Sequence, residues 1–594
     1  MSDYILVAVA WPYASADIHV GNITGSYLPA DIYARYQRLA GNHVLMVSGS
    51  DSHGTPVTVK ADEENSTPLE IYKRYHNHFI TLFQKLGLTY DLFTSTHTRN
   101  HFEVAQSMFL ALKENGYLFT KVEKQWFSET QQRFLPDRYV EGTCYICGYE
   151  KARGDQCDKC GSLLDARKLI DPRSKNDNST PVLRETEHFY LDLAKLEKPV
   201  VEFLESRQEY WRANVVKQSL GWIKAKGLHE RPITRDLKWG IPVPLEGWEG
   251  KSLYVWFEAV IGYISATIEW AQLGSDKDAW HNWWYDKTAR TIYFIGKDNI
   301  PFHAIMWPAQ LYGAGKTFGK IFEGEESGPL NLPYDVPANE FMNMEGKKIS
   351  GSANWGVWGL DFLARYDPDP LRYYLTINMP ESKDSDWDWA DFLARNNNEL
   401  VATWGNLANR VLSFANKHWQ GIVPEPGELR PTDKAILEVI EGGFETVGHL
   451  IDTIKLRAAL SETMRLASEV NKYLDQAAPW FEIKQNKDAA AKTIYTALRA
   501  IDSLKILFAP FLPFTSEKLH TYLGYTQPLF GEQSVETQAD DLGEHTVLRY
   551  HAGPGGKQWV PSTLAPSAPI RKPAPLFRKL EPKIVEEERE KLGN

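Results

Sequence analysis

The four cysteines of the chain fall in two closely spaced pairs, Cys144-x2-Cys147 and Cys157-x2-Cys160, with nine residues between the pairs and a glycine after each. Four thiolates at this spacing can surround one tetrahedral zinc ion, and the glycines permit the tight turns of such knuckles. Two disulfides are the alternative, but a cytoplasmic chain would keep these thiols reduced. We therefore expect one structural Zn²⁺ with these four cysteines as its ligands.

Residues 345–352, EGKKISGS, combine glycines and serines with two adjacent lysines, Lys347 and Lys348. This composition suits either a loop that grips phosphate or a solvated turn, and the segment alone leaves both open. A second candidate, GAGKT at 313–317, fails the phosphate-loop pattern because Gln310 stands where a glycine is needed. It also follows a helical pattern instead of a strand, so we interpret it as a solvated helix end.

A histidine and a glycine, His19 and Gly21, lie in WPYASADIHVGN, between a short apolar run and a helical pattern. A helix N-terminus attracts anions, and a nearby histidine can donate to a phosphate oxygen. A single histidine near a turn is more often structural, so this segment needs support from other motifs.

The elements that position His19 form a βαβ pattern. The apolar run YILVAVA at 4–10, a helical pattern from about 25 to 39 and HVLMVSG at 43–49 predict a strand, a helix and a strand. Continuous apolar runs of this kind are typical of buried parallel strands. A right-handed crossover places the loop after the first strand at the carboxyl edge of the sheet, where open α/β folds bind ligands.

The length of 594 residues predicts several domains, since single cores stop growing at roughly 250–300 residues. All four cysteines lie in a stretch that reads as an insertion, and TIYFIG at 291–296 restarts the α/β pattern. From about 391 apolar positions recur at helical spacing, which predicts a bundle. After about 530 the chain is rich in turn residues, and PSTLAPSAPIRKPAP reads as an extended linker. The predicted domains are 1–117 and 231–330 for two sheet halves, 118–230 for the insertion with its knuckle at 144–160, 331–390 for the lysine-loop region, 391–530 for the helices and 531–594 for a linker and tail.

The net charge of −11 gives no global attraction to polyanions, so any nucleic-acid-binding face must be local. The start, MSDYILVAVAWPY, lacks the basic region and cleavage site of a secretion signal. No stretch reaches the roughly 18 apolar residues of a spanning helix. We expect a cytoplasmic protein with no membrane partner.

Five segments, taken together and in order, resemble the class I aminoacyl-tRNA synthetases and, among them, the methionyl-tRNA synthetase family. They are WPYASADIHVGN, SGSDSHGTP at 48–56, YVWFEAVIGY at 254–263, FIGKDNIPFHAIMWP at 294–308 and EGKKISGS. With the zinc knuckle and NKYLDQAAPW in the helical part, the resemblance extends from about residue 4 to residue 520. The family's HIGH motif corresponds to HVGN at 19–22, and its KMSKS motif to KISGS at 348–352.

The resemblance implies a two-step ligase reaction, carried out by a split Rossmann-type α/β catalytic domain and a helical anticodon-binding domain. Methionine carboxylate attacks the α-phosphate of ATP, bound with Mg²⁺, and gives methionyl-adenylate and pyrophosphate. The 3′ end of tRNA(Met) then takes the methionyl group. This chemistry needs positioned donors that stabilise charge on phosphorus more than it needs a general base.

Motif matches imply the residues of each subsite. For catalysis they give His19, Asn22, Lys348 and Lys347, and for ATP His19, Gly21, Asn22, Gly296, Asp298, Lys348 and Ser350. For L-methionine they give Trp11, Tyr13, Asp51, Trp256, Ala259, Tyr263, Asn299 and His303, and for the anticodon Asn406, Arg410 and Trp480. In this resemblance Asp51 pairs with the substrate ammonium, and aromatic walls suit the polarisable sulfur. Plain core packing is the alternative for the pocket aromatics, and a capped helix junction is the alternative for Trp480.

Several positions depart from the family pattern. Asn22 stands where the family more often has its second histidine, and Trp11 stands where it usually has leucine. In YVWFEAVIGY, Glu258 replaces the family's aspartate and Val260 replaces its proline. Gly351 stands where the loop usually has its second lysine, and we hypothesise that Lys347 partly replaces that charge. VPANEFMNM, before the loop, lacks the expected glycine and histidine, so the sequence gives no adenine contacts.

Two other functions stay open. A class I synthetase for isoleucine, valine or leucine would carry a much larger editing insertion than the roughly 110 residues here, and the cysteine enzyme uses zinc inside its amino-acid pocket. A non-enzymatic zinc-containing RNA-binding protein would need a basic surface at the knuckle, where TCYICGYEKARGDQCDKCG has mixed charge. Methionine is therefore favoured. About 50 turn-rich residues follow the helices, too few for an appended dimerisation domain, so we expect a monomer.

Overall fold

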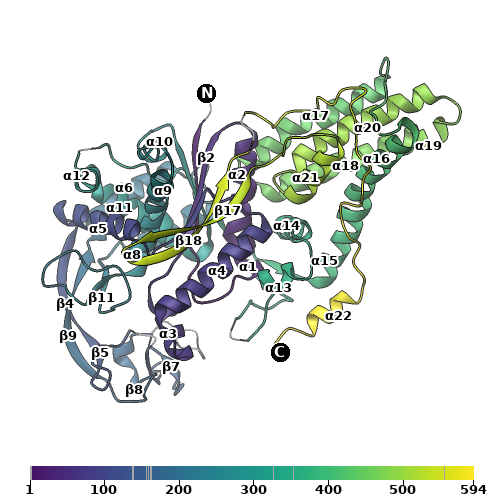
Figure 1. The fold of residues 1–594 in the computed structure, drawn as a ribbon. Helices are drawn as coiled ribbons and strands as arrows, with labels where there is room; N and C mark the ends of the chain where they lie inside the picture. Colours follow the sequence, from purple (N-terminus) through teal and green to yellow (C-terminus); the bar gives the residue numbers. More distant parts are fainter. Residues whose placement is uncertain are drawn as a thin grey trace.

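A computed structural model describes residues 3–136, 139–154, 157, 159–160, 164–325, 327–351, 353–553 and 556–593. A twisted sheet, on the left of Figure 1, forms the centre of its N-terminal part, and in the described residues its strand order is β14-β13-β1-β2-β3-β18-β17. These strands are β1 (Tyr4–Val9), β2 (His43–Ser50), β3 (Leu92–Ser95), β13 (Arg290–Gly296), β14 (Ala338–Asn339), β17 (Glu532–Asp540) and β18 (Gly543–His551).

The strands from β14 to β3 in this order run parallel, as the continuous apolar runs predict. Alternate residues of β1 enter two hydrophobic cores, Val7 on one face of the sheet and Leu6 on the other. Helix α2 (Leu28–Leu39) contributes to the first core and α9 (Gly262–Leu273) to the second. Because helices cover both faces, the strands need no polar face.

Further helices surround this sheet. They are α1 (Val20–Asn22), α3 (Thr55–Glu64), α4 (Pro68–Leu86), α5 (Arg99–Glu114), α8 (Val255–Glu258), α10 (His281–Trp284), α11 (Trp307–Ala314) and α12 (Thr317–Phe322). A π-helical segment, Ile23–Tyr27, joins α1 to α2. Residues 20–39 therefore form one continuous helical path, and Asn339 at the end of β14 donates to its Thr24 carbonyl at 2.9 Å.

The insertion forms β-structure of its own, at the lower left of Figure 1. It contains the sheet β7-β6-β8 and strands β9, β4 and β5 of the sheet β10-β9-β4-β5, while β10 and the pair β11-β12 follow the predicted boundary at residue 230. Their bounds are β4 (Leu118–Ser128), β5 (Arg133–Phe134), β6 (Val140–Thr143), β7 (Ala152–Arg153), β8 (Ile170–Ser174), β9 (Val182–Leu191), β10 (Arg231–Pro232), β11 (Thr234–Arg235) and β12 (Ser252–Leu253), with helices α6 (Glu197–Ser206) and α7 (Ala213–Lys226). The cysteine loops extend from the β7-β6-β8 sheet, which confirms the predicted fold class of an α/β domain split by a zinc-knuckle insertion.

The helical part lies on the right of Figure 1, where α17, α18 and α20 pack against one another. The preceding region contains β15 (Met342–Met344), α13 (Gly359–Leu363), α14 (Pro368–Ile377), β16 (Ser385–Trp387) and α15 (Trp389–Arg395). The helical part itself contains α16 (Asn406–Trp419), α17 (Pro431–Asp452), α18 (Leu456–Ala477), α19 (Pro479–Glu482), α20 (Lys487–Phe508) and α21 (Pro513–Tyr522). The predicted α-helical bundle is present. None of the described helices is both long and apolar enough to cross a membrane.

The structure differs from the sequence prediction at residues 532–551, which we expected to belong to a linker. They form the hairpin β17–β18, and β18 pairs antiparallel with β3 through Leu548 and Phe93. Val547 and Leu548 are buried, so the segment has an apolar side that belongs to the sheet. Covering the edge of β3 also removes an unpaired strand edge. The many Glu, Gln and Asp residues of β17 explain why the pattern looked like a loop.

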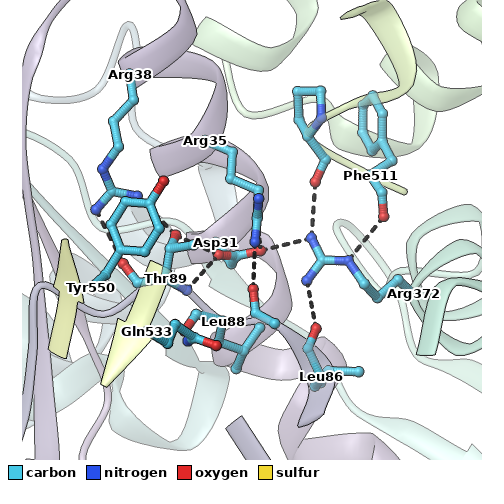
Figure 2. Close-up of polar contacts among 12 residues, drawn as sticks. Asp31, Arg35, Arg38, Leu86, Leu88, Thr89, Arg372, Phe511, Gln533 and Tyr550 are labelled. Atoms are coloured by element: carbon cyan, nitrogen blue, oxygen red, sulfur yellow. Dashed lines mark hydrogen bonds and ion pairs between the residues drawn. The ribbon is translucent and has the colours of Figure 1, made fainter. Parts of the chain in front are cut away.

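A buried ion-pair cluster connects the sheet domain to the helical part (Figure 2). The Asp31 carboxylate of α2 accepts from Arg35 at 2.9 Å and from Arg372 of α14 at 2.7 Å, and the side chains of Asp31 and Arg372 are fully buried. Arg372 also donates to the Phe511 carbonyl at 2.9 Å, just before α21. Breaking such a buried pair is strongly destabilising. The cluster therefore fixes α2, which begins near the sheet edge, against the helical part.

Candidate active site

Residues 18–20 and 357–359 run side by side at the carboxyl end of β1. The Val20 amide donates to the Val357 carbonyl at 3.0 Å, and the Gly359 amide donates to the Ile18 carbonyl at 2.9 Å. A Cβ atom on Gly21 would lie 3.2 Å from Ile349 of the lysine loop. The structure thus brings together the two segments that the sequence singled out, the histidine turn and the lysine loop.

His19 presents a neutral imidazole at this junction. Burial lowers the pKa of His19 to about 4, so the ring is uncharged near neutral pH. Its Nδ1 is buried and has no hydrogen-bond partner among the described residues. The His19 backbone amide donates to Asn22 Oδ1 at 3.1 Å, which orients the Asn22 amide at the start of α1. A buried ring nitrogen without a partner is available to a ligand.

The neighbouring rim of the site is the end of β13. A Cβ atom on Gly296 would lie 2.8 Å from Asp298 Oδ1, so a side chain there would displace the carboxylate. Asp298 itself is exposed. Burial raises the pKa of Tyr27, and the Asp298 charge raises it further, which shows that this carboxylate lies near the helical path after His19.

The lysine loop starts as a tight hairpin. Met344 and Lys347 exchange backbone hydrogen bonds of 2.7 and 3.0 Å around a left-handed turn, with φ of 48° at Glu345 and 75° at Gly346. The Lys347 Nζ lies 4.6 Å from the centroid of Trp355. The following Lys348 has its Nζ 5.8 Å from the centroid of Phe341, so the two cations lie over different rings.

The rest of the loop returns antiparallel to its start. The Ser350 amide donates to the Trp355 carbonyl at 2.9 Å, and Trp355 donates back to Ser350 at 2.9 Å. Gly351 is exposed, and the final serine of the motif, Ser352, lies outside the described residues. Of the predicted loop residues, Lys347, Lys348 and Ser350 therefore lie on one compact loop beside His19.

Asp51 is a buried carboxylate that lacks a counter-charge. Its backbone is held by the Ala14 amide, which donates to the Asp51 carbonyl at 2.9 Å, and by its own amide, which donates to Pro12 at 2.8 Å. The residue is 3% exposed, and its Oδ1 has no hydrogen-bond partner in the described part of the chain. Burial, and then the charge of Glu258, raise the pKa of Asp51 well above its usual range. A cationic ligand would offset both the cost of burying the Asp51 charge and its repulsion by Glu258.

Aromatic side chains surround this carboxylate. The Trp256 indole donates to the Tyr13 hydroxyl, and Trp256 is 44% exposed, so its ring forms an open wall. Burial and the nearby Asp51 charge raise the pKa of Tyr13, which therefore stays a phenol. Trp11 occupies the space above two glycines, since Cβ atoms on Gly49 and Gly262 would lie 2.2 and 2.6 Å from its ring.

A fixed tyrosine–histidine pair lies next to Trp11, whose ring centroid is 6.3 Å from that of Tyr263. Tyr263 Oη and His303 Nε2 are 2.7 Å apart, and His303 Nδ1 donates to the Asn299 carbonyl at 3.0 Å. Burial lowers the pKa of His303 to about 4, so its ring is neutral and Nε2 accepts from the tyrosine. Ala259, the remaining predicted pocket residue, lies at the end of α8.

Near Asp51 lies a polar cluster, centred on Glu258, that the motif matches did not assign to the site. The Glu258 carboxylate is fully buried and accepts from His53 at 2.9 Å and from His101 at 2.8 Å. Burial alone would raise the pKa of Glu258, but the hydrogen bonds from His101 and His53 hold it below its usual value. These hydrogen bonds favour the charged form of Glu258, and this charge raises the pKa of Asp51. The substitution of the family's aspartate by Glu258 was the sequence signal for this cluster.

The four predicted metal ligands come together. The Sγ atoms of Cys144, Cys147, Cys157 and Cys160 all lie within 4.8 Å of one another, and no disulfide joins them. The Cys147 and Cys157 sulfurs are 3.6 Å apart, close to the roughly 3.8 Å edge of a tetrahedron with metal–sulfur bonds of about 2.3 Å. The cluster could hold one metal ion with four protein ligands.

The predicted anticodon residues lie at one end of the helical part. The Arg410 guanidinium lies 4.7 Å from the centroid of the Trp480 ring, and Arg410 donates to Asn471 Oδ1 at 3.2 Å. Asn406 is exposed one helical turn before Arg410, on the same face of α16. Trp480 lies in α19, just after Ala478, whose φ is 42°. Arg410 and Trp480 are both half-buried, so part of the Trp480 ring remains accessible although the residue lies at the helix junction.

Comparison with known proteins agrees with this geometry. Residues 5–412 match the family model described as tRNA synthetases class I (M), and residues 423–547 match the anticodon binding domain of methionyl tRNA ligase. A methionine–tRNA ligase of Thermomicrobium roseum is 53% identical over 100% of this chain and 99% of its own length. One of Roseiflexus castenholzii is 51% identical with the same coverage. The chain belongs to the methionine–tRNA ligase family.

The fold of this family member also resembles a solved structure. The Mycobacterium tuberculosis methionyl-tRNA synthetase bound by methionyl-adenylate superposes with a TM-score of 0.74, at 21% identity, over 97% of this chain and 100% of that chain. At this identity the likeness supports the fold alone. Membership of a ligase family excludes the alternative of a non-enzymatic RNA-binding protein and favours methionine over other class I substrates.

Proposed function

We propose that this chain ligates L-methionine to tRNA(Met) in two steps, through methionyl-adenylate. One observation carries the proposal: the Asp51 carboxylate is buried and its Oδ1 has no partner among the described residues. The α-ammonium group of an amino acid is the kind of cation that such a carboxylate needs. Its position beside Tyr13 and the aromatic wall gives the amino acid a defined orientation.

The pocket walls suit a thioether side chain. Tyr263, His303 and Trp256 all have their polar atoms engaged in hydrogen bonds, so they present ring surfaces to the substrate. Sulfur contacts with aromatic rings are favourable, and these walls offer a charged side chain no partner. We assign Trp11, Tyr13, Ala259 and Asn299 to the same pocket.

In the first step a methionine carboxylate oxygen forms a bond to the α-phosphorus of ATP, and the bond to the leaving pyrophosphate breaks. Neutral His19 donates a hydrogen bond to the phosphate, and Lys348 and Ser350 stabilise the charge of the departing pyrophosphate. Gly21 and Gly296 leave space for the nucleotide, and Asp298 accepts from the ribose. Mg²⁺ accompanies ATP and neutralises phosphate charge.

Lys347 supplies part of the positive charge that the family's second loop lysine would provide and that Gly351 cannot. Both lysines of the loop are exposed, so either ammonium group can leave its aromatic ring and reach a polyanion. Asn22 has its Oδ1 engaged by the His19 amide and keeps its NH₂ group as a donor. We assign it a weaker role than His19.

The four cysteines bind one Zn²⁺, which holds the loops of the insertion together. Four thiolates saturate a tetrahedral zinc ion, so no position remains for substrate and the site is structural. The tRNA anticodon binds at Asn406, Arg410 and Trp480, where a splayed base can stack on the indole and present its edge to the polar groups. We propose that a monomer in the cytoplasm carries out both steps.

Methionine-dependent exchange of pyrophosphate into ATP tests the proposal. The purified chain is expected to catalyse exchange with L-methionine and to show much lower kcat/KM with leucine, isoleucine, valine and cysteine. Preferential exchange with another amino acid would contradict the substrate assignment. Absence of exchange with every amino acid would contradict the enzymatic assignment.

A further inference from the structure

The lysine loop is held from outside the catalytic domain, by residues 584–593. This tail segment contains α22 (Ile584–Arg589), which lies beside α15 in Figure 1. No role was predicted for this segment, because it resembles a short charged helix after a proline-rich stretch. Its contacts fall at both ends of the loop that carries Lys347 and Lys348.

Glu588 anchors the segment. Its side chain is only 4% exposed, and its carboxylate accepts from Arg365 at 2.9 Å and from the Tyr366 hydroxyl at 2.8 Å. Both donors lie between α13 and α14, in the part of the chain that follows the loop. A buried carboxylate with these donors is costly to remove from its site, so the position of α22 is fixed relative to the loop region.

The next residue, Arg589, reaches the start of the loop. Its Nε and a terminal nitrogen donate to the two carboxylate oxygens of Glu345 at 3.0 and 3.1 Å, and the guanidinium also lies 3.3 Å from Asp388. Glu345 is the turn residue with φ of 48°, two positions before Lys347. A two-pronged arginine–carboxylate contact fixes orientation as well as distance. The turn that sets the direction of both lysines is thus clamped by Arg589.

The far end of the loop is held through the backbone. The Gly593 amide donates to the Asn354 carbonyl at 3.0 Å, and Asn354 Oδ1 accepts from the Trp358 indole at 3.1 Å. The Lys347 Nζ lies over the ring of the neighbouring Trp355, and the Trp355 indole donates to the Met344 carbonyl at 2.9 Å. The two ends of the loop are therefore tied to the same segment, while Lys348 and Gly351 remain exposed between them.

We propose that residues 584–593 position the lysine loop, with Arg589 acting through Glu345 to hold Lys347 and Lys348 ready for the triphosphate. Arg589 also pairs with the Glu345 carboxylate, which could otherwise pair with these lysines. The expected change in kcat rests on the proposed function, whereas the expected change in loop cleavage does not. Arg589 is a positioning residue, since it touches neither substrate nor the reacting atoms.

The test uses the full chain with Arg589→Gln, Glu345→Gln and the double variant. Because the pair is partly exposed, we expect a loss of about three- to fivefold in kcat of pyrophosphate exchange, with KM for methionine unchanged. If Arg589 acts through Glu345, the double variant loses no more than either single variant. Arg589→Lys, which keeps the charge without the two-pronged contact, should retain part of the activity. Lys583→Gln is the matched control, because Lys583 of the same region pairs only with Glu587 in the ion pairs of the described residues, at 3.2 Å.

A second readout does not depend on the reaction. Trypsin should cleave after Lys347 or Lys348 faster in Arg589→Gln than in the wild-type chain or Lys583→Gln, while the melting temperature stays the same. Unchanged cleavage and unchanged or raised kcat in Arg589→Gln would overturn the proposal. A wild-type chain without methionine-dependent exchange would instead count against the proposed function, and the cleavage rates would still decide whether the tail holds the loop.

Discussion

Replacing Asp51 by asparagine should have opposite effects on catalysis and on stability. Asparagine has nearly the same shape but cannot pair with an ammonium ion. Truncating one partner of a buried, hydrogen-bonded charge pair costs about 2–5 kcal/mol. For Asp51, which is 3% exposed, a value near the middle, about 3–4 kcal/mol, corresponds to a loss of roughly 10²–10³-fold in kcat/KM for methionine.

The empty protein should become more stable with the same substitution. Asp51 is buried without a counter-charge, and burial and Glu258 raise its pKa. The contribution of a carboxyl with a raised folded-state pKa is most favourable below its unfolded pKa of about 3.9 and is lost as the pH rises through the folded value. Asp51→Asn should therefore gain about 1–2 kcal/mol at pH 7, because it removes a buried charge that repels Glu258, and much less near pH 4.

The assay compares L-methionine with its deaminated analogue, 4-(methylthio)butanoate, by equilibrium binding to the wild type and to Asp51→Asn. The wild type should prefer methionine strongly, and the variant should lose most of that preference while its melting temperature at pH 7 rises. Methionine affinity of the wild type should fall on acidification, because protonated Asp51 has no charge, whereas the variant should show no such fall. Asp361→Asn, an exposed carboxyl change, is the control. Retained preference for methionine in Asp51→Asn would refute the reasoning.

Four further outcomes follow from the structure. His19→Gln should lower kcat of adenylate formation by roughly 10²–10³-fold, and the wild-type pH–rate profile should show no histidine limb near 6.5, because burial lowers the pKa of His19 to about 4. Cys144→Ser should reduce the zinc content measured by atomic absorption and lower the melting temperature of the insertion. Trp480→Ala should weaken aminoacylation of tRNA(Met) by about 1–3 kcal/mol of lost base stacking and leave pyrophosphate exchange unchanged. Asp31→Asn should cost roughly 3–5 kcal/mol in urea unfolding at pH 7, because it leaves Arg372 buried without its partner. Burial alone would raise the pKa of Asp31, but Arg35 and Arg372 hold it at about 2, so this contribution is present above the unfolded pKa of about 3.9 and is lost as the pH falls through about 2.

Local patterns predicted much of the fold, and the family resemblance supplied the candidate residues of the site. The apolar run of β1 marked a buried parallel strand, and this placed His19 at the sheet edge before the structure was known. The spacing of the four cysteines was sufficient to predict their convergence, because a knuckle is built from short-range turns.

Long-range pairings were not predictable in the same way. The hairpin β17–β18 joins β3 across more than 400 residues of chain, and its polar outer face hides the apolar side that the sheet buries. Glu258 stood out only as a departure from the family, because its partners His53 and His101 come from other elements. Arg589 and Glu345 are ordinary charged residues in sequence, and only the fold shows that they meet.

Aminoacylation measures the central claim most directly, because it requires both the pocket and the helical part. The purified chain, supplied with ATP, Mg²⁺ and radiolabelled L-methionine, should charge tRNA(Met) transcripts and should charge poorly a transcript that differs only in its anticodon. Equal charging of both transcripts would contradict the assignment of Asn406, Arg410 and Trp480. Failure to charge tRNA(Met) with methionine, in a preparation whose fold is intact, would contradict the function proposed for the chain.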